Sequence, residues 1–208
     1  MIKEFEIKID TGYYKNYFFK EDNKLAITNN AYELSIYPVK IELRTCKDKE
    51  SNQTGDLIAT VLGYYFDMNF MLNEGIPLFD IFDGESQETY ELYEALFKNH
   101  EYKENLNVFN PNLFYLYDIF VEDDYRQEGY CTLLINQLDE ILQYVAKLNV
   151  GVIATKIYEF ESIDKIDSIE HLTKKEKLEL NKKLKNIFIN NNYECLENNN
   201  DNLVKVIY

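Results

Sequence analysis

The chain has 208 residues, a length that suits one domain, and its 37 acidic and 22 basic side chains give a formal charge of −15. This charge argues against a protein that binds nucleic acid or anionic lipid, because phosphate contacts need clustered Lys and Arg. No run of residues approaches the roughly 18 apolar positions of a membrane span. The N-terminal sequence MIKEFEIKID also lacks the apolar core of a signal peptide. We therefore expect a cytoplasmic protein.

The cysteines and histidines do not form a metal-binding pattern. Cys46, Cys131 and Cys195 are odd in number and widely scattered, which is typical of reduced thiols and not of a disulfide frame. His100 and His171 are far apart, and neither is near a pair of cysteines. We expect no metal site.

The first hundred residues have mainly the pattern of β-strands, with apolar and β-branched residues that alternate or cluster. Strands are predicted at 4–9, 24–28, 32–45 and 56–68. Pro38 in the third of these indicates a break or an edge position. The turn at 51–55 joins the last two strands into a long antiparallel hairpin.

The stretch 73–85 is predicted to be irregular. A helix is then predicted from about Ser86 to Asn99, because Tyr90, Tyr93, Leu96 and Phe97 share one face at helical spacing. More loop covers 100–112.

The second half contains a strand–helix–strand unit. Residues 113–121 are nearly all apolar, which is typical of a central strand buried on both faces. A helix from about Gly129 to Leu148 and a core strand at 150–158 complete a βαβ unit. Thr173 and Glu176 form a capping box that opens a helix to about Phe188, and the chain ends in a hairpin with an Asn-rich turn.

The corner between the strand at 113–121 and the following helix is the clearest candidate for a binding site. A strand that ends in a tight turn with Gly and then enters a helix presents free backbone N–H groups, which favour an anion such as pyrophosphate. Many corners of this kind carry one Arg and one Gly for turn geometry alone, so both interpretations remain open at this point.

From Tyr115 the chain reads Y-L-Y-D-I-F-V-E-D-D-Y-R-Q-E-G-Y-C-T-L-L. This passage resembles motif A of the GNAT superfamily of N-acetyltransferases, L-x-V-x-P-x-Y-R-x-x-G-x-G/A, in the form found in aminoglycoside 3-N-acetyltransferases. The family's Pro is Asp123 here, and its last Gly or Ala is Cys131. The matching residues are Ile119, Val121, Tyr125, Arg126 and Gly129.

A second passage supports the first. From Asn181, N-K-K-L-K-N-I-F-I-N-N-N-Y-E-C-L is similar to the family's C-terminal signature N-x-x-A-x-x-L-Y-x-x-L-G-F. Asn181, Leu184 and Ile187 match in place or in kind. Phe188 stands where Tyr is usual, and Asn192 can supply the left-handed conformation of the family's Gly.

The resemblance implies an α+β fold (of α/β type). Its mixed, mostly antiparallel central sheet has a splayed strand pair and helices on both faces. The resemblance covers roughly 113–208, so we expect one GNAT-like domain over 1–208 in which 1–112 is a divergent half. The helix at 86–99 and the segment 159–172 stand where the family usually has no such elements.

The resemblance also implies the cofactor, acetyl-CoA, and the residues that hold it. The backbone of Ile119, Phe120 and Val121 would pair with the pantetheine arm and polarise the thioester carbonyl, and Asn181 would bond to the arm from the other side. The pyrophosphate would lie on the backbone amides of Arg126, Gln127, Glu128, Gly129, Tyr130 and Cys131.

Asp118 is the candidate catalytic residue. It is the only charged residue in an otherwise apolar strand, and it occupies the position of an acidic residue in the aminoglycoside-modifying relatives. A carboxylate in a mostly buried strand should have a raised pKa unless it is paired, which suits a proton acceptor. The alternative is a polar residue satisfied by backbone where the strands splay.

The expected activity is acetyl-CoA-dependent N-acetylation of an amine, and the acidic surface favours a cationic acceptor. Phe188 lacks the hydroxyl of the usual tyrosine acid, which Tyr130, Tyr158, Tyr193 or water would replace. Cys131 at a helix N-terminus is more readily explained as a packing residue than as a reactive thiol.

Two alternatives remain. A GNAT-fold binding module with a decayed cofactor site is favoured by Phe188 and by the acidic residues around Arg126, and an acidic interaction protein is favoured by the charge alone. Nucleic acid and membrane are not expected as partners. A homodimer through the Tyr-rich first half is compatible with the sequence, although no residue pattern demonstrates it.

Overall fold

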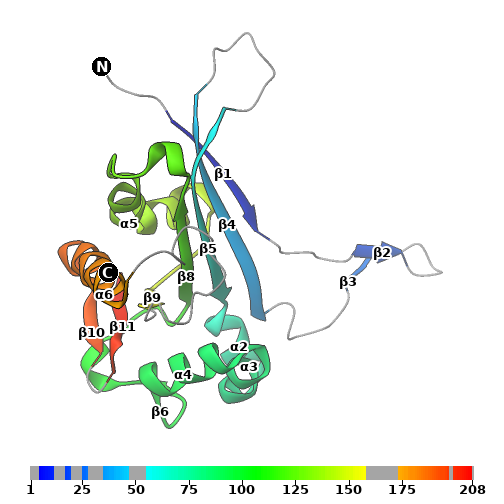
Figure 1. Cartoon of the computed structure of the whole chain (residues 1–208). Helices are drawn as coiled ribbons and strands as arrows, with labels where there is room; N and C mark the ends of the chain where they lie inside the picture. Colours follow the sequence, from blue (N-terminus) through cyan, green and yellow to red (C-terminus); the bar gives the residue numbers. More distant parts are fainter. Residues whose placement is uncertain are drawn as a thin grey trace.

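A seven-stranded sheet forms the centre of the molecule, which we describe from a computed structural model over residues 5–11, 17–19, 25–27, 35–46, 55–157, 173–196 and 199–207 (Figure 1). The strand order is β1-β4-β5-β8-β9-β11-β10, and every neighbouring pair is antiparallel except β8 and β9. Its strands are β1 (Phe5–Thr11), β4 (Ile36–Thr45), β5 (Leu57–Phe66), β8 (Leu113–Val121), β9 (Val152–Lys156), β10 (Glu194–Leu196) and β11 (Asn199–Val206). The predicted α+β class with a mixed, mostly antiparallel sheet is confirmed.

Helices cover both faces of this sheet. On one face lie α5 (Tyr130–Glu140), a π-helical turn (Ile141–Val145) that continues it, and α6 (Lys174–Asn190). On the other face α2 (Met68–Glu74), α3 (Leu78–Glu85) and α4 (Gln87–Leu96) pack where β5 ends and β8 begins. Each face therefore has its own apolar core, and the strands between them are buried on both sides.

Two short hairpins and a 3₁₀ turn complete the described elements. β2 (Tyr17–Phe19) pairs with β3 (Leu25–Ile27), and β6 (Phe97–Lys98) pairs with β7 (Glu101–Tyr102). The 3₁₀ turn spans Glu104–Leu106.

The predicted hairpin of the first half is confirmed as β4 and β5. Pro38 does not break β4, because its partner across the ladder is Tyr64 of β5 and the described pairing with β1 starts only at Val39. Pro38 therefore occupies a locally one-sided part of an inner strand, where its missing N–H is tolerated.

The prediction of an irregular stretch at 73–85 is wrong, and the strand predicted to reach residue 68 ends at Phe66. Asp67 caps α2 by accepting a hydrogen bond from the Phe70 N–H at 3.0 Å. Gly75 (φ +66°) ends α2 in the left-handed region, and Pro77 precedes the first turn of α3. The Gly and Pro that suggest a loop thus mark the boundaries of two short helices.

The predicted helix at 86–99 is α4, which ends three residues earlier. Ser86 and Thr89 form a reciprocal capping box, and the Thr89 hydroxyl also donates to the Phe82 carbonyl at 2.6 Å. This bond joins α3 to α4, so the two helices pack on the sheet as a unit.

The βαβ unit of the second half is confirmed as β8, α5 and β9, with the helix ending as a π turn instead of reaching Leu148. The capping box at Thr173 and the final hairpin are also confirmed. Most of the predicted turn at 51–55 and the segment 159–172 lie outside the described residues. None of the described helices is both long and apolar enough to cross a membrane.

Candidate functional site

The central parallel strands separate halfway along β8, as the resemblance implies. β8 and β9 pair from Leu113↔Val152 to Leu116↔Thr155, and β8 then continues to Val121 without a described partner on that side. On its other side β8 stays paired with β5, but the register shifts so that Tyr117 is the extra residue. A bulge of this kind bends its strand. Beyond this point the structure describes no strand beside the edge of 117–121 that faces β9.

This edge of β8 leads into the N-terminus of α5. The chain makes a 3₁₀ turn at Asp123–Tyr125, passes Gln127 at φ +65°, and reaches the helix at Gly129, φ +87°. Gly129 offers no side-chain cap, and the first bond of the helix runs from the Leu133 N–H to the Gly129 carbonyl at 3.0 Å. The N–H groups of the first turn consequently point out of the helix end, where an anion is favoured.

The guanidinium of Arg126 is bound within its own loop. Its guanidinium lies 2.7 Å from the Asp123 carboxylate, donates to the Val121 carbonyl at 3.1 Å, and stacks over the Phe120 ring. The exposed carboxylates of Asp124 and Glu128 add negative charge to the same loop. Attraction for a phosphate at this corner must therefore come mainly from backbone N–H groups and the helix dipole.

Asn181 lies on the inner face of α6, in line with Leu184 and Phe188. Its Oδ1 atom is buried and has no hydrogen-bond partner within the described chain. A buried acceptor without a partner is uncommon in folded proteins, so a polar group from outside the described residues is expected beside it. This position agrees with the expected contact to a bound arm, and the contact itself stays a prediction.

Phe188 belongs to the core and cannot replace the family's acid. It is 1% exposed, and its ring packs edge-on against Tyr193 at 5.0 Å. The Tyr193 hydroxyl is buried without a hydrogen-bond partner among the described groups, and burial raises its pKa far above the usual value. Tyr130 is also buried, and Tyr158 lies outside the described residues.

Asp118 follows the bulge directly and lies on the sheet face that α2–α4 occupy further along. Its partner across the ladder is Leu62. Partial burial of the carboxyl group raises the pKa of Asp118, and a hydrogen bond from the Ile119 backbone opposes the shift. Because the side chain as a whole is exposed, solvent screening limits this effect.

Cys131 is a packing residue, as the sequence analysis expects. Cys131, in the first turn of α5, packs against the core, and burial raises the pKa of its thiol to about 11, the opposite of an activated nucleophile. Cys46 and Cys195 are exposed thiols. No group of three potential metal ligands occurs in the part of the chain that the structure describes.

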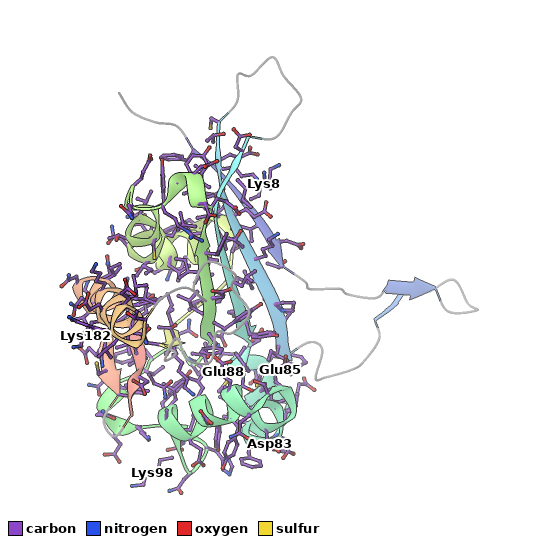
Figure 2. All side chains as sticks on the ribbon, viewed as in Figure 1. Lys8, Asp83, Glu85, Glu88, Lys98 and Lys182 are labelled. Carbon is purple, nitrogen blue, oxygen red and sulfur yellow. The ribbon has the colours of Figure 1, made fainter. Side chains whose placement is uncertain are left out.

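A polar cluster that the sequence analysis did not identify lies across the sheet from α5. Figure 2 shows Glu85 and Glu88 at the junction between the α3–α4 pair and the strands. The Tyr115 hydroxyl donates to Glu88, and Lys156 Nζ lies 2.5 Å from Glu91 Oε2. We call this group the Glu–Tyr cluster; its members are Tyr64, Glu85, Glu88, Glu91, Tyr115, Tyr117 and Lys156.

Glu88 has the most perturbed carboxyl group of this cluster. Burial raises its pKa to about 7, the Lys156 ammonium opposes the shift, and the Glu91 carboxylate adds to it. No local pattern marks Glu88, because its partners are 27 and 68 positions away in the chain. The only usable signal is the helix itself, which stands where the resemblance predicts none.

Comparison with known proteins gives little further information. No family model matches the chain, and no curated protein matches it. A similar solved structure, "The crystal structure of KacTA-DNA complex", aligns with 97% of this chain and 93% of that chain, at 8% sequence identity and a TM-score of 0.41. The DNA in that title belongs to that protein, and so distant a likeness carries neither partner nor activity over to this one.

Proposed function

We propose that this protein is a GNAT-type N-acetyltransferase that moves an acetyl group from acetyl-CoA to an amine of a cationic acceptor. The observation that carries the proposal is the parting of β8 and β9 beyond Leu116 and Thr155. It opens a backbone edge that ends at the uncapped N-terminus of α5. A thioester on a long polar arm with a pyrophosphate at its far end has the chemistry that these two features would bind.

In this proposal the pantetheine arm of acetyl-CoA lies between β8 and β9, where the two strands separate. The open edge at Ile119–Val121 offers N–H and C=O groups to its amides, and the first turn of α5 offers N–H groups to its pyrophosphate. Asn181 supplies a buried acceptor for an N–H of the arm from the opposite wall. A backbone N–H beside the bulge would stabilise the oxyanion that forms on the thioester carbonyl.

The acceptor would approach from the face that carries Asp118 and the Glu–Tyr cluster. A primary amine has a pKa near about 10.4 and arrives as ammonium, so it must lose a proton before it attacks. Carboxylates on this face attract an ammonium group, which agrees with the formal charge of −15. With Phe188 in the core, solvent would protonate the departing thiolate.

A binding module with no catalytic activity is the second candidate. Arg126 is held by Asp123, and a loop rich in carboxylates opposes an anionic cofactor within about 8 Å in physiological salt. Calorimetric titration with acetyl-CoA followed by turnover of an amine panel separates the two. Binding without turnover would favour the module, and no binding at millimolar acetyl-CoA would contradict the enzyme.

A carboxylate in the first turn of α5 should block the donor site while stabilising the helix. Thr132 is exposed there, so Thr132→Glu should raise stability by about 0.3 to 1 kcal/mol through the helix dipole. We expect the same variant to weaken acetyl-CoA binding by at least tenfold. Thr132→Gln has the same size without the charge and is the control for both measurements. Equal acetyl-CoA affinities of the Glu and Gln variants at low salt would contradict the proposal that the pyrophosphate binds at this helix end.

Asn181→Leu should change stability and binding in opposite directions. Removing a buried acceptor that has no partner should stabilise the unliganded protein by about 1 kcal/mol or more in urea unfolding. Loss of one hydrogen bond to the arm should weaken acetyl-CoA binding up to about tenfold. Asn186→Leu, exposed on the same helix, is the control and should leave the affinity unchanged. A stabilised variant with parental affinity would exclude Asn181 from the donor site.

A further inference from the structure

The Glu–Tyr cluster lies beside the point where β8 bulges. Tyr64 and Tyr115 are partners across the β5–β8 ladder, and the Tyr64 ring stacks on Tyr117 at 5.3 Å. Glu85 accepts a hydrogen bond from Tyr64, and Glu88 accepts one from Tyr115. The helices inserted between β5 and β8 thus bring the carboxylates of Glu85 and Glu88 to Tyr64 and Tyr115, a ladder pair close to the bulge.

The opposite wall of the cluster is polar and incompletely satisfied. Lys156, the last residue of β9, lies one position beyond the final pair of the parallel ladder. Its partner across the ladder is Asn202 of β11, on the same sheet face. Asn202 is 1% exposed, and neither atom of its amide group has a hydrogen-bond partner in the described parts of the chain. A buried amide with both ends unpaired is uncommon, so a polar group from outside the described residues is expected beside it.

We propose that Glu88 is the base that removes a proton from the acceptor ammonium, and that Tyr115 and Lys156 position it. This inference rests on the proposed function. The carboxylate takes one ammonium proton, and the freed nitrogen lone pair attacks the thioester carbonyl carbon. The C–N bond forms first and gives the oxyanion, and the C–S bond breaks when the carbonyl re-forms. The second nitrogen proton passes through solvent to the CoA thiolate, and Glu88 releases its proton to solvent.

Glu88 suits this role better than Asp118 because of how each is held. Glu88 is half-buried and fixed by the Tyr115 hydroxyl, whereas Asp118 is exposed at the strand surface. The groups that interact with Glu88 are Tyr115 of β8, Lys156 of β9, Tyr64 of β5 and Glu91 of α4, and Glu85 of α3 shares Tyr64 with it. A base works best when its pKa is near the working pH, and about 7 meets that condition. Asp118 remains available to bind a second positive charge of the acceptor.

The test compares Glu88→Gln with Glu94→Gln, an exposed position on the same helix. CoA release is followed with spermidine, kanamycin and a lysine-bearing peptide as acceptors. At pH 7 Glu88→Gln should lower kcat at least hundredfold with the acetyl-CoA Kd unchanged within twofold, and Glu94→Gln should match the parent. The parental kcat should fall on the acid side with a midpoint near pH 7. Asp118→Asn should keep that midpoint and raise KM.

Each other outcome decides against the proposal. If Glu88→Gln keeps kcat within threefold of the parent, or if the parental profile has no acid limb above pH 6, the base is another group and the proposed function stands. The second readout needs no variant, so it holds even if Glu88→Gln does not fold. Acetyl-CoA binding without turnover of any acceptor would contradict the role of Glu88 as a base and favour the binding module. A parent that does not bind acetyl-CoA overturns both proposals.

Discussion

Gly63→Ala should lower the free energy of unfolding by about 2 to 3 kcal/mol, although it adds a single methyl group. A Cβ atom on Gly63 would lie 2.2 Å from Phe114 Cζ and 2.7 Å from the Tyr115 carbonyl oxygen. Neither neighbour yields easily, since the Phe114 ring is fully buried in the core and the carbonyl belongs to the central strand. β8 would have to move beside its bulge, so the variant should also weaken acetyl-CoA binding.

Urea unfolding followed by circular dichroism measures this loss, and Gly84→Ala provides a matched control. Gly84 is exposed within α3, where Ala is favoured over Gly by about 0.5 to 1 kcal/mol. The same chemical change should therefore destabilise at one position and stabilise at the other. A Gly63→Ala protein as stable as the parent would mean that β5 and β8 do not approach each other this closely.

The stability of the protein should fall as the pH rises through the range in which Glu88 titrates. The folded state raises the pKa of Glu88 from its usual 4.5 to about 7, so between these values the folded state binds the proton more tightly than the unfolded state. The contribution is fully present below pH 4.5 and is lost as the pH approaches and passes 7. The shift corresponds to about 3 kcal/mol. Because Glu88 is only half-buried, screening by solvent reduces the expected effect to about 1 to 2 kcal/mol.

Urea unfolding of the parent and Glu88→Gln at pH 4.5 and pH 8 isolates this effect. The variant should be more stable than the parent by about 1 to 2 kcal/mol at pH 8 and nearly equal to it at pH 4.5. Glu94→Gln should follow the parent across the range, since Glu94 is exposed. A constant difference between Glu88→Gln and the parent would contradict a raised pKa at Glu88.

The β8–α5–β9 unit could be predicted because its signals are local. A long apolar run specifies a strand buried on both faces, and an apolar stripe at helical spacing specifies the helix between two such strands. The capping box at Thr173 is equally local. By contrast, Gly75 and Pro77 are ambiguous signals, since Gly and Pro occur both in loops and at helix boundaries. Only the apolar contacts of α2 and α3 with the sheet decide between these alternatives.

The candidate site divides in the same way. The sequence by itself determined the corner at Gly129 and the order of the elements around it, because an uncapped helix that follows a strand is a property of neighbouring residues. It also nominated Asp118, the one charge in an apolar strand. Only the tertiary structure decided that the expected parting of β8 and β9 begins after Leu116, that Arg126 is bound to Asp123, and that Glu88 meets Tyr115. Strand pairing, ion pairing and burial depend on residues that are distant in the chain, and the altered pKa of Glu88 exists only once those residues surround it.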